Sequence, residues 1–272
     1  MKYRLIAADL DGTLLNEYSR LGERTRSILE RAISQGAVFV PATGRPACAV
    51  PDEIRSISGV RYIISSNGAQ IYDLDSFSVI HQVTLPYDTV IEMLRRFRNT
   101  DAWTEICIDG TTYVDNKYYD HIRNYISTER SINYLTSTRK GVPSIEKVIR
   151  DNPDKLEKLC LFFKTPEDKL QAVKEFGHMD HIYSVTAFDT IFELSSEHAN
   201  KGDAMYYIAD LLNIPHDKTI AFGDGMNDKI MLDYAGLGVA MENSFPGVKD
   251  SAKLIAPPNT EEGVAQILEQ YF

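Results

Sequence analysis

Short apolar runs alternate with amphipathic stretches in the first third of the chain. The apolar runs are bounded by turn residues and lie at 3–9 (YRLIAAD), 37–43 (AVFVPAT) and 61–68 (RYIISSNG). Runs of this length are typical of strands buried on both faces of a parallel sheet. Residues 22–36 place Ile28 and Leu29 on one helical face and end at Gly36, a favourable helix terminus. The pattern predicts a β-α-β-α-β order.

The same alternation returns near the carboxyl end of the chain. Residues 201–214 place Ala204 and Ile208 at helical spacing before a strand-like run, KTIAFGD, at 218–224. A last helix is predicted from the apolar residues Val264, Ile267, Leu268 and Tyr271. Together these parts predict one α/β core, a doubly wound and mainly parallel sheet built from residues 1–84 and 194–272.

The middle of the chain, residues 85–193, follows a different pattern. Asp109-Gly110 separates two alternating runs, which predicts a β-hairpin, and Pro166 suits the first turn of a helix. Strands and helices mix here without the β-α-β order, so this part is predicted to be an inserted α+β domain. The polar stretch 126–144 is predicted to be a solvated loop within it.

Composition and charge narrow the range of partners. The formal net charge is -10 without a Lys/Arg-rich block, so the protein is predicted to repel nucleic acid and anionic membranes. Neither an apolar run of about eighteen residues nor a secretory signal is visible, which predicts a cytoplasmic protein. Cys48, Cys107 and Cys160 are odd in number and widely spaced, so they are predicted to be buried free thiols. His178 and His181 are predicted to be solvated loop residues, and the oligomeric state is left open.

Residues whose side chains could bind a ligand or take part in a reaction follow the predicted strands, at the sheet edge where ligands usually bind. They are Asp9 and Asp11 after the first strand, Thr43–Arg45 after the second, Ser66–Gly68 after the third, Gly223–Asp228 after the strand at 218–224, and Lys201 at the start of the preceding helix. An Asp-Gly turn alone is common at a strand end, because both residues tolerate turn geometry. Several carboxylates at one edge are less common, since like charges destabilise one another unless a cation compensates them.

A divalent metal is the natural compensating charge. Mg²⁺ prefers oxygen ligands and usually binds one or two carboxylates together with a phosphate oxygen. Asp9 and Asp224 are therefore predicted to hold it. Asp228 and the carbonyl oxygen of Asp11 are predicted to complete the site.

The remaining groups suit a phosphate dianion. They are the charged side chains of Lys201 and Arg45 and the hydrogen-bonding side chains of Thr43 and Asn227. A carboxylate is already ionised at neutral pH and needs no partner base, so Asp9 is predicted to attack phosphorus. Asp11 is predicted to protonate the leaving group and later to activate water.

These motifs resemble those of the haloacid dehalogenase-like (HAD) phosphatase superfamily, in its Cof-type, class IIB branch. DLDGTLL, ATGR, NKG and GDGMND match four family motifs in order, and the resemblance spans essentially all 272 residues. It implies a Rossmann-like HAD core with a cap domain inserted between the second and third motifs. It also implies the roles of Asp9 as nucleophile, Asp11 as acid/base, Thr43 and Lys201 as phosphate ligands, and Asp224 and Asp228 as metal-site acids.

Gly44 and Asn67, which lie in the TGR and SNG motifs, are assigned to phosphate or substrate binding with Arg45 and Asn227. One departure from the family is visible, because residues 241–243 read MEN where the family commonly has Met-Gly-Asn. The departure puts a glutamate side chain near the rim of the site. It leaves open whether Glu242 and Asn243 contribute to the site.

The predicted function is that of a Mg²⁺-dependent phosphomonoesterase acting through an aspartyl-phosphate. The substrate is predicted to be a small phosphorylated metabolite, a sugar phosphate or similar, because a cap that closes over the sheet edge excludes polymers and water. A phosphosugar mutase on the same scaffold remains an alternative. A non-enzymatic phospho-acceptor or sensor is another, although receiver domains with similar residues are much shorter and lack a cap.

Overall fold

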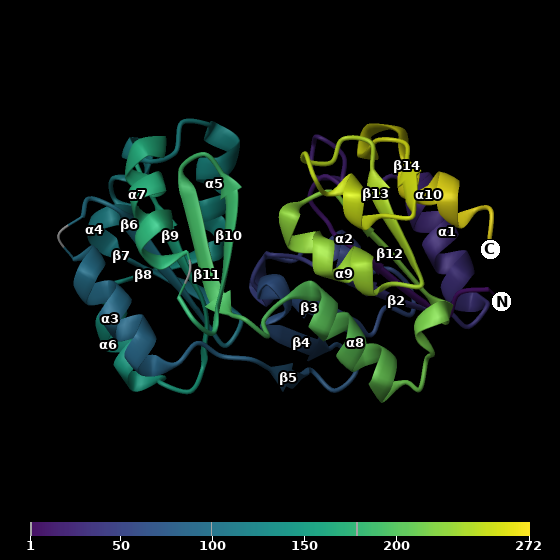
Figure 1. Cartoon of the computed structure of the whole chain (residues 1–272), viewed down its shortest axis with the longest axis horizontal. Coiled ribbons are helices and arrows are strands. Elements are labelled where there is room, and N and C mark those ends of the chain that lie inside the picture. Colours follow the sequence, from purple (N-terminus) through teal and green to yellow (C-terminus); the bar gives the residue numbers. More distant parts are fainter. Residues whose placement is uncertain (1, 99, 178) are drawn as a thin grey trace. The chain divides into compact units, whose positions relative to one another are not determined.

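The computed structural model describes residues 2–98, 100–177 and 179–272, which form two compact units (Figure 1). Unit 1 comprises the described residues of Met1–Arg45, Val50–His81 and Asn200–Phe272. Unit 2 comprises those of Pro46–Ala49 and Gln82–Ala199, so it interrupts unit 1 twice along the chain. The role of the middle segment as a cap stays a prediction.

Unit 1 is built on a parallel sheet with the strand order β14-β13-β12-β1-β2. β1 pairs in parallel with β12 on one side and with β2 on the other. All of β1 is buried, as its apolar run predicted. The strands are β1 (Leu5–Ala8), β2 (Val38–Pro41), β12 (Thr219–Gly223), β13 (Leu237–Met241) and β14 (Leu254–Ala256).

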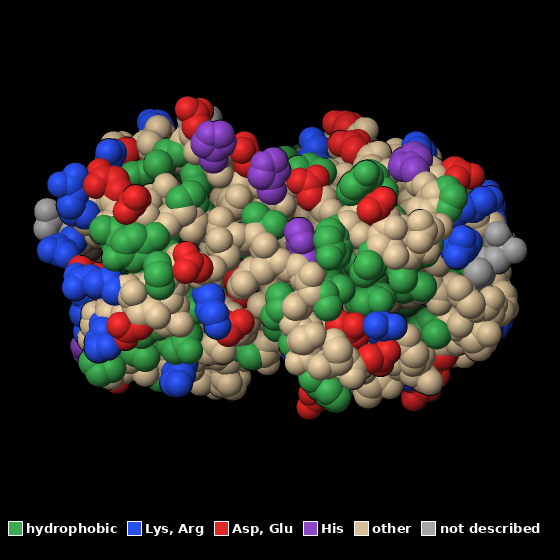
Figure 2. Space-filling view, turned by 90° about the horizontal axis from the view of Figure 1, so that it is seen from below, with side chains coloured by type: hydrophobic (Ala, Val, Ile, Leu, Met, Phe, Trp, Pro, Cys, Tyr) green, Lys and Arg blue, Asp and Glu red, His purple; other side chains and the backbone are tan. Residues whose placement is uncertain are grey.

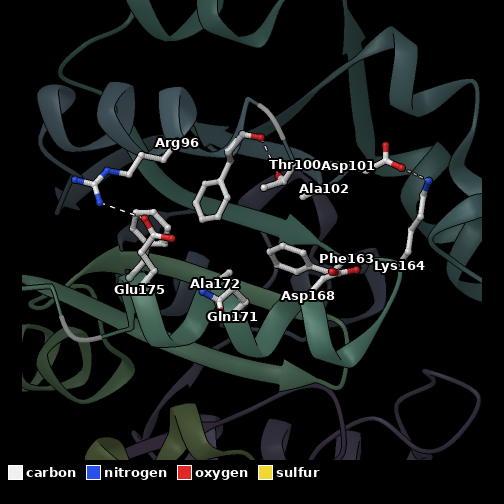
Figure 3. A pocket seen from close by; sticks show the side chains of 12 residues that line it. Arg96, Thr100, Asp101, Ala102, Phe163, Lys164, Asp168, Gln171, Ala172 and Glu175 are labelled. Carbon is white, nitrogen blue, oxygen red and sulfur yellow. Dashed lines mark hydrogen bonds and ion pairs between the residues drawn. The ribbon is translucent and has the colours of Figure 1, made fainter.

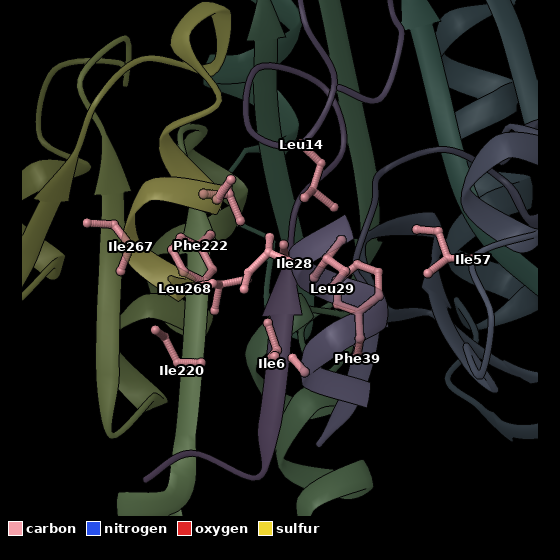
Figure 4. Close-up of a cluster of buried hydrophobic side chains, with 14 of the residues drawn as sticks. Ile6, Leu14, Ile28, Leu29, Phe39, Ile57, Ile220, Phe222, Ile267 and Leu268 are labelled. Carbon is pink, nitrogen blue, oxygen red and sulfur yellow. The ribbon is translucent and has the colours of Figure 1, made fainter. Parts of the chain in front are cut away.

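Helices cover both faces of this sheet, which confirms the predicted doubly wound α/β class (Figure 1). On one face α1 and α10 contribute to an apolar cluster in which Leu29 joins Ile6 and Phe222 (Figure 4). On the other face α8 and α9 contribute to a second cluster, in which Ile208 joins Ala7. The helices are α1 (Glu23–Ser34), α2 (Asp52–Arg55), α8 (Lys201–Leu211), α9 (Lys229–Tyr234) and α10 (Gly263–Leu268).

The third predicted parallel strand is not part of the parallel sheet. It forms a separate sheet in the order β3-β4-β5, made of β3 (Tyr62–Ser65), β4 (Gln70–Asp73) and β5 (Ser78–Gln82). β3 pairs antiparallel with β4, and an isolated parallel bridge joins it to the end of β2. The turn that follows β3 explains the antiparallel pairing with β4, since Ser66, Asn67 and Gly68 all have positive φ angles and reverse the chain.

Unit 2 combines strands and helices, as the α+β pattern predicted. The expected hairpin at Asp109-Gly110 joins β6 and β7, and α7 begins at Pro166 after the N-cap Thr165. Its sheet has the order β10-β11-β9-β6-β7-β8. The elements are β6 (Trp103–Ile108), β7 (Thr111–Asp115), β8 (Arg139–Val142), β9 (Leu156–Phe162), β10 (Ile182–Phe188), β11 (Ile191–Ser196), α3 (Tyr87–Phe97), α4 (Asn116–Tyr119), α5 (Glu129–Thr138), α6 (Ile145–Asp151) and α7 (Pro166–Phe176).

The predicted loop at 126–144 is wrong, because this stretch contains α5 and β8. Thr128 caps the helix by accepting the backbone N–H of Ser131 at 3.3 Å. Ile132 and Leu135, three positions apart, are buried in a cluster with Trp103. The apolar face of α5 is too narrow to stand out in a polar stretch, so tertiary packing rather than periodicity defines this helix.

Two predictions about cysteines and histidines have mixed outcomes. Cys107 and Cys160 are buried free thiols, whereas Cys48 is exposed because it lies in a short 3₁₀ turn rather than in a strand. His181 is exposed and lies 2.7 Å from Glu197, and His178 lies outside the described residues. None of the helices in the three described ranges is long and apolar enough to cross a bilayer.

Candidate active site

The carboxyl ends of β1, β2 and β12 lie side by side because these strands are parallel neighbours. Asp9 directly follows β1 and Asp224 directly follows β12. The backbone N–H of Asp9 donates to the carbonyl of Phe222 at 3.0 Å, which continues the pairing to the strand ends. Thr43 follows β2 and donates its N–H to the carbonyl of Ile64 at 2.9 Å. The sheet therefore brings several of the predicted site residues to one edge.

A fully buried lysine links two of the predicted carboxylates. Lys201 is the first residue of α8, directly after Asn200, whose side chain caps the helix by accepting the N–H of Asp203 at 2.8 Å. The Lys201 ammonium donates to Oδ1 of Asp9 and to Oδ1 of Asp228, both at 2.7 Å. Because all three side chains are almost completely removed from solvent, the lysine is the main compensating charge for both acids.

Asp224 completes an acidic cluster. Asp9, Asp224 and Asp228 each offer one oxygen, and these atoms lie within 4.8 Å of one another. The Thr13 hydroxyl donates to Oδ1 of Asp224 at 2.7 Å. Oδ2 of Asp228 accepts the N–H groups of Asp224 and Gly225 at 2.9 and 2.8 Å, which closes the 224–228 turn. Sequence reasoning missed Thr13, although its place in the DLDGTLL motif marked it for attention.

The surroundings disfavour three negative charges in one place. Burial raises the pKa of Asp9 well above its usual value, Lys201 opposes this shift, and Asp228 adds to it. Burial and the neighbouring Asp228 carboxylate raise the pKa of Asp224 to about 6. Burial by itself lowers the pKa of Lys201, but Asp228 and Asp9 outweigh it and raise that pKa above its usual value. Three carboxylates facing one ammonium leave the cluster short of positive charge.

Gly12 is required where the chain passes Asp224. A Cβ at Gly12 would lie 2.3 Å from Oδ2 of Asp224, and the φ angle of +84° strains any L-residue.

We expect Gly12→Ala to lower the free energy of unfolding by about 2–4 kcal/mol, from backbone strain and steric overlap together. Gly247→Ala is a matched control, because Gly247 has a φ of +80° and a Cβ there would have no atom within 4 Å. Urea unfolding measures both variants, and equal losses would show that Asp224 moves aside at no cost.

Asp11 forms a two-pronged ion pair with Arg45. Nε of Arg45 lies 2.7 Å from Oδ2 of Asp11, and Nη2 lies 2.6 Å from Oδ1. Such a bidentate pair fixes the orientation of both planar groups. The Asp11 side chain is half exposed, whereas that of Arg45 is mostly buried. The structure thus joins the predicted acid/base to a predicted phosphate-binding residue, a pairing that the sequence did not indicate.

The other residues predicted to bind phosphate lie in interlocked turns. Oγ1 of Thr43 accepts the N–H of Arg45 at 3.1 Å, and the carbonyl of Thr43 accepts the N–H of Asn67 at 3.0 Å. A Cβ at Gly44 would lie 2.8 Å from Oδ1 of Asn67, so glycine permits this approach. Asn227 donates its side-chain N–H to the same Oδ1 at 2.9 Å. The SNG turn is therefore held between the TGR turn and the GDGMND loop.

The MEN segment contributes two different contacts. Glu242 is exposed and forms an ion pair of 3.2 Å with Lys249. Asn243 donates its side-chain N–H to the carbonyl of Gly12 at 2.8 Å. The segment therefore reaches the turn that follows Asp9 through the asparagine rather than through the glutamate.

A cavity of about 260 Å³ lies in unit 2, between α3 and α7 (Figure 3). Phe97, Phe163 and Phe176 line its apolar part, and Arg96 and Glu175 at its rim form an ion pair of 3.3 Å. Within the described part of the chain, the cluster in unit 1 is the one group of three side chains placed to hold a metal ion. That cluster, and not the cavity, is the candidate active site.

The surface charge is mixed on the face that Figure 2 shows. Acidic and basic side chains are interspersed there over both units. The predicted absence of nucleic-acid and membrane partners rests on the formal net charge of -10 and stays a prediction.

Comparison with known proteins bears on the predicted family. A family model described as haloacid dehalogenase-like hydrolase matches residues 6–268. Phosphatase YwpJ of Bacillus subtilis is 30% identical, over 98% of this chain and 99% of its own length. A haloacid dehalogenase-like hydrolase from B. subtilis has a solved structure with a TM-score of 0.83 and 29% identity, covering 99% of this chain and 100% of that one.

The fold is shared by a solved structure of the predicted subclass at lower sequence identity. The solved HAD subclass IIB sugar phosphatase BT4131 has a TM-score of 0.81 at 20% identity and covers 98% of both chains. The predicted enzyme class, a phosphatase, is confirmed by the relatives named phosphatases. With its family match over nearly the whole length and its strand-edge aspartates, the chain belongs to the haloacid dehalogenase-like hydrolase family.

Proposed function

We propose that the protein is a Mg²⁺-dependent phosphomonoesterase that acts on a small phosphorylated metabolite through a phosphorylated Asp9. The observation that carries the proposal is the cluster of Asp9, Asp224 and Asp228 around the buried Lys201 ammonium. The family match and the phosphatase relatives support the reaction class.

The donor set fits a hard divalent cation. All the converging ligand atoms are carboxylate oxygens, and the cluster is short of positive charge by two units when its acids are ionised and Lys201 is protonated. Asp9 and Asp224 would hold Mg²⁺, helped by Asp228 and the carbonyl oxygen of Asp11. When bound, the metal neutralises charge and polarises a phosphoryl oxygen.

The chain's own groups supply the rest of the phosphoryl site. Lys201 would stabilise the charge that develops on the phosphoryl oxygens, since it already lies 2.7 Å from Asp9. The hydroxyl of Thr43 and the amide of Asn227 would donate hydrogen bonds, together with backbone N–H groups of the turn after Asp9. Gly44 and Asn67 would shape the adjoining wall. Arg45 would contact the substrate while it holds Asp11.

Two steps follow from these placements. In the first, a carboxylate oxygen of Asp9 forms a bond to phosphorus as the ester P–O bond breaks, and Asp11 gives a proton to the departing oxygen. In the second, Asp11 takes a proton from water, whose oxygen attacks phosphorus and releases phosphate and the free Asp9 carboxylate. The Arg45 pair would orient the ionised Asp11 carboxylate that takes the proton from water in the second step, and one of its two bonds would open when Asp11 carries the proton for the first.

The test is a turnover assay with Mg²⁺ across aryl phosphates, sugar phosphates and other small phosphate esters. We expect inorganic phosphate to be released steadily and far beyond one equivalent per protein molecule, with one substrate group preferred in kcat/KM. Labelling that stops at one equivalent would indicate a phospho-acceptor instead. Transfer of phosphate to a second sugar hydroxyl without release would indicate a mutase.

Lys201→Ala is expected to reduce kcat by about two to three orders of magnitude, because it removes a charge that the transition state needs. It also leaves Asp9 and Asp228 buried without their cation, which should destabilise the fold by about 3–5 kcal/mol. Steady-state kinetics at a temperature where circular dichroism shows the variant folded separates the two effects.

Lys155→Ala is the matched control, since Lys155 forms an exposed ion pair of 2.9 Å with Asp109 in unit 2. An exposed pair contributes about 0–1 kcal/mol, so this variant should keep its stability and its kcat. Lys201→Arg keeps the charge with a different donor geometry, so it separates the loss of charge from the loss of the ammonium position. If Lys201→Ala keeps a normal kcat and only its KM rises, the lysine does not stabilise the transition state.

A further inference from the structure

The segment after β13 is tied to the turn that carries Asp9. Nδ2 of Asn243 donates to the carbonyl of Gly12 at 2.8 Å, across 231 positions of sequence. Oδ1 of Asn243 accepts the backbone N–H of Asn259 at 3.0 Å. Both ends of the Asn243 amide are therefore engaged with the protein itself.

Asn259 extends this connection. Its own Nδ2 donates to the carbonyl of Leu15 at 2.7 Å. The two asparagines thus grip the 12–15 segment at both ends, through the carbonyl oxygens of Gly12 and Leu15. We refer to Asn243 and Asn259 as the asparagine clamp.

Residues 12–15, which the clamp holds through their carbonyl oxygens, also contact Asp224. Gly12 lies so close to Asp224 that a Cβ would overlap its carboxylate, and Thr13 donates to that carboxylate at 2.7 Å. Backbone bonds from Leu14 to the carbonyl of Asp9 and from Leu15 to that of Leu10 complete the turn. A shift of the 12–15 segment would therefore move the Asp9 backbone and Asp224 together.

We propose that Asn243 is a positioning residue, which with Asn259 fixes the turn that carries Asp9 and so sets the geometry of the reacting carboxylate. The proposal rests on the proposed function for its kinetic consequence. Its structural part, the immobilisation of residues 9–16, does not depend on any activity. Asn243 does not contact the substrate in this assignment, because its carbonyl oxygen and one of its N–H groups are already committed.

The test compares Asn243→Ala and Asn243→Asp with the unchanged protein. Asn243→Ala removes both bonds and should reduce kcat roughly ten- to hundred-fold with KM within about two-fold, because small misplacements of reacting groups have effects of this size. Asn243→Asp keeps the acceptor for the N–H of Asn259 but places a carboxylate oxygen against the Gly12 carbonyl oxygen. Its kcat should therefore fall at least as far as that of Asn243→Ala. The factor should be the same for an aryl phosphate and for alkyl phosphates, since positioning does not involve the leaving group.

Asn152→Ala is a matched control. Asn152 in unit 2 also donates its side-chain N–H to a backbone carbonyl, that of Val148, at 2.9 Å. Its loss should leave kcat unchanged. Hydrogen exchange of peptides covering residues 9–16 should speed up in Asn243→Ala and not in Asn152→Ala.

Each other outcome overturns the assignment. A raised KM, or a loss that differs between aryl and alkyl phosphates, would make Asn243 a substrate contact. Unchanged exchange in residues 9–16 would show that no clamp exists, even if activity falls. Unchanged kcat with faster exchange would limit Asn243 to a structural role. If the protein hydrolyses no phosphate ester, the proposed function fails, and the exchange experiment still decides the clamp.

Discussion

Asp9→Asn is expected to abolish turnover and the formation of a phosphoenzyme together. An amide oxygen is a far poorer nucleophile than a carboxylate, so the loss of kcat should reach about five to six orders of magnitude. The fold should remain intact, because the amide keeps the shape of the side chain and an oxygen for the Lys201 ammonium. Burial already raises the pKa of Asp9, so a neutral group at this position should be tolerated.

The measurement is the amount of phosphate trapped on the protein after acid quenching of a reaction with a labelled aryl phosphate. The unchanged protein should carry an acid-stable label that hydroxylamine removes, as expected of an acyl phosphate. Asp217→Asn is the control, because Asp217 is an exposed side chain 3.7 Å from Lys218 in a surface turn. Stoichiometric labelling of Asp9→Asn at the normal rate would require another nucleophile.

Removal of divalent metal is expected to reduce turnover to the background rate. The reason is electrostatic, since a phosphate dianion has to approach three clustered carboxylates that share a single ammonium. Added Mg²⁺ should restore the rate. Ca²⁺ should bind and support little turnover, because its larger and looser coordination misplaces the attacking oxygen.

Phosphate release after treatment with a chelator, followed by addition of each metal, measures this effect. Thermal unfolding supplies an independent readout, because a ligand that binds the folded state raises its stability. Asp224→Asn should weaken the shift caused by Mg²⁺, whereas the exposed substitution Asp217→Asn should not. Full activity in metal-free buffer would exclude the proposed metal site.

The sequence alone determined the α/β class and the ends of the strands that lead to the candidate site. Apolar runs bounded by turn residues predicted β1, β2 and β12, because a strand buried on both faces needs apolar residues at every position. Parallel neighbours end at one edge, so the order of motifs sufficed to bring Asp9 and Asp224 together. The helix that begins at Lys201 was predicted from the helical spacing of Ala204 and Ile208.

Tertiary structure decided which partners these side chains have. The pairing of Asp11 with Arg45, the bond from Thr13 to Asp224 and the clamp formed by Asn243 are contacts between distant segments. No periodicity or spacing encodes them, because each depends on how turns of different strands meet at the sheet edge.

Tertiary structure also decided two elements that local patterns misplaced. The left-handed turn at residues 66–68 returns β4 antiparallel to β3, although the run at 61–68 resembles the buried parallel strands in composition. In α5, Ile132 and Leu135 acquire their burial from a cluster with Trp103 on another element. The periodicity of apolar residues indicates which side chains of a segment are buried. The packed fold sets the direction of the chain after a turn, and it also sets which neighbouring element covers a narrow apolar face.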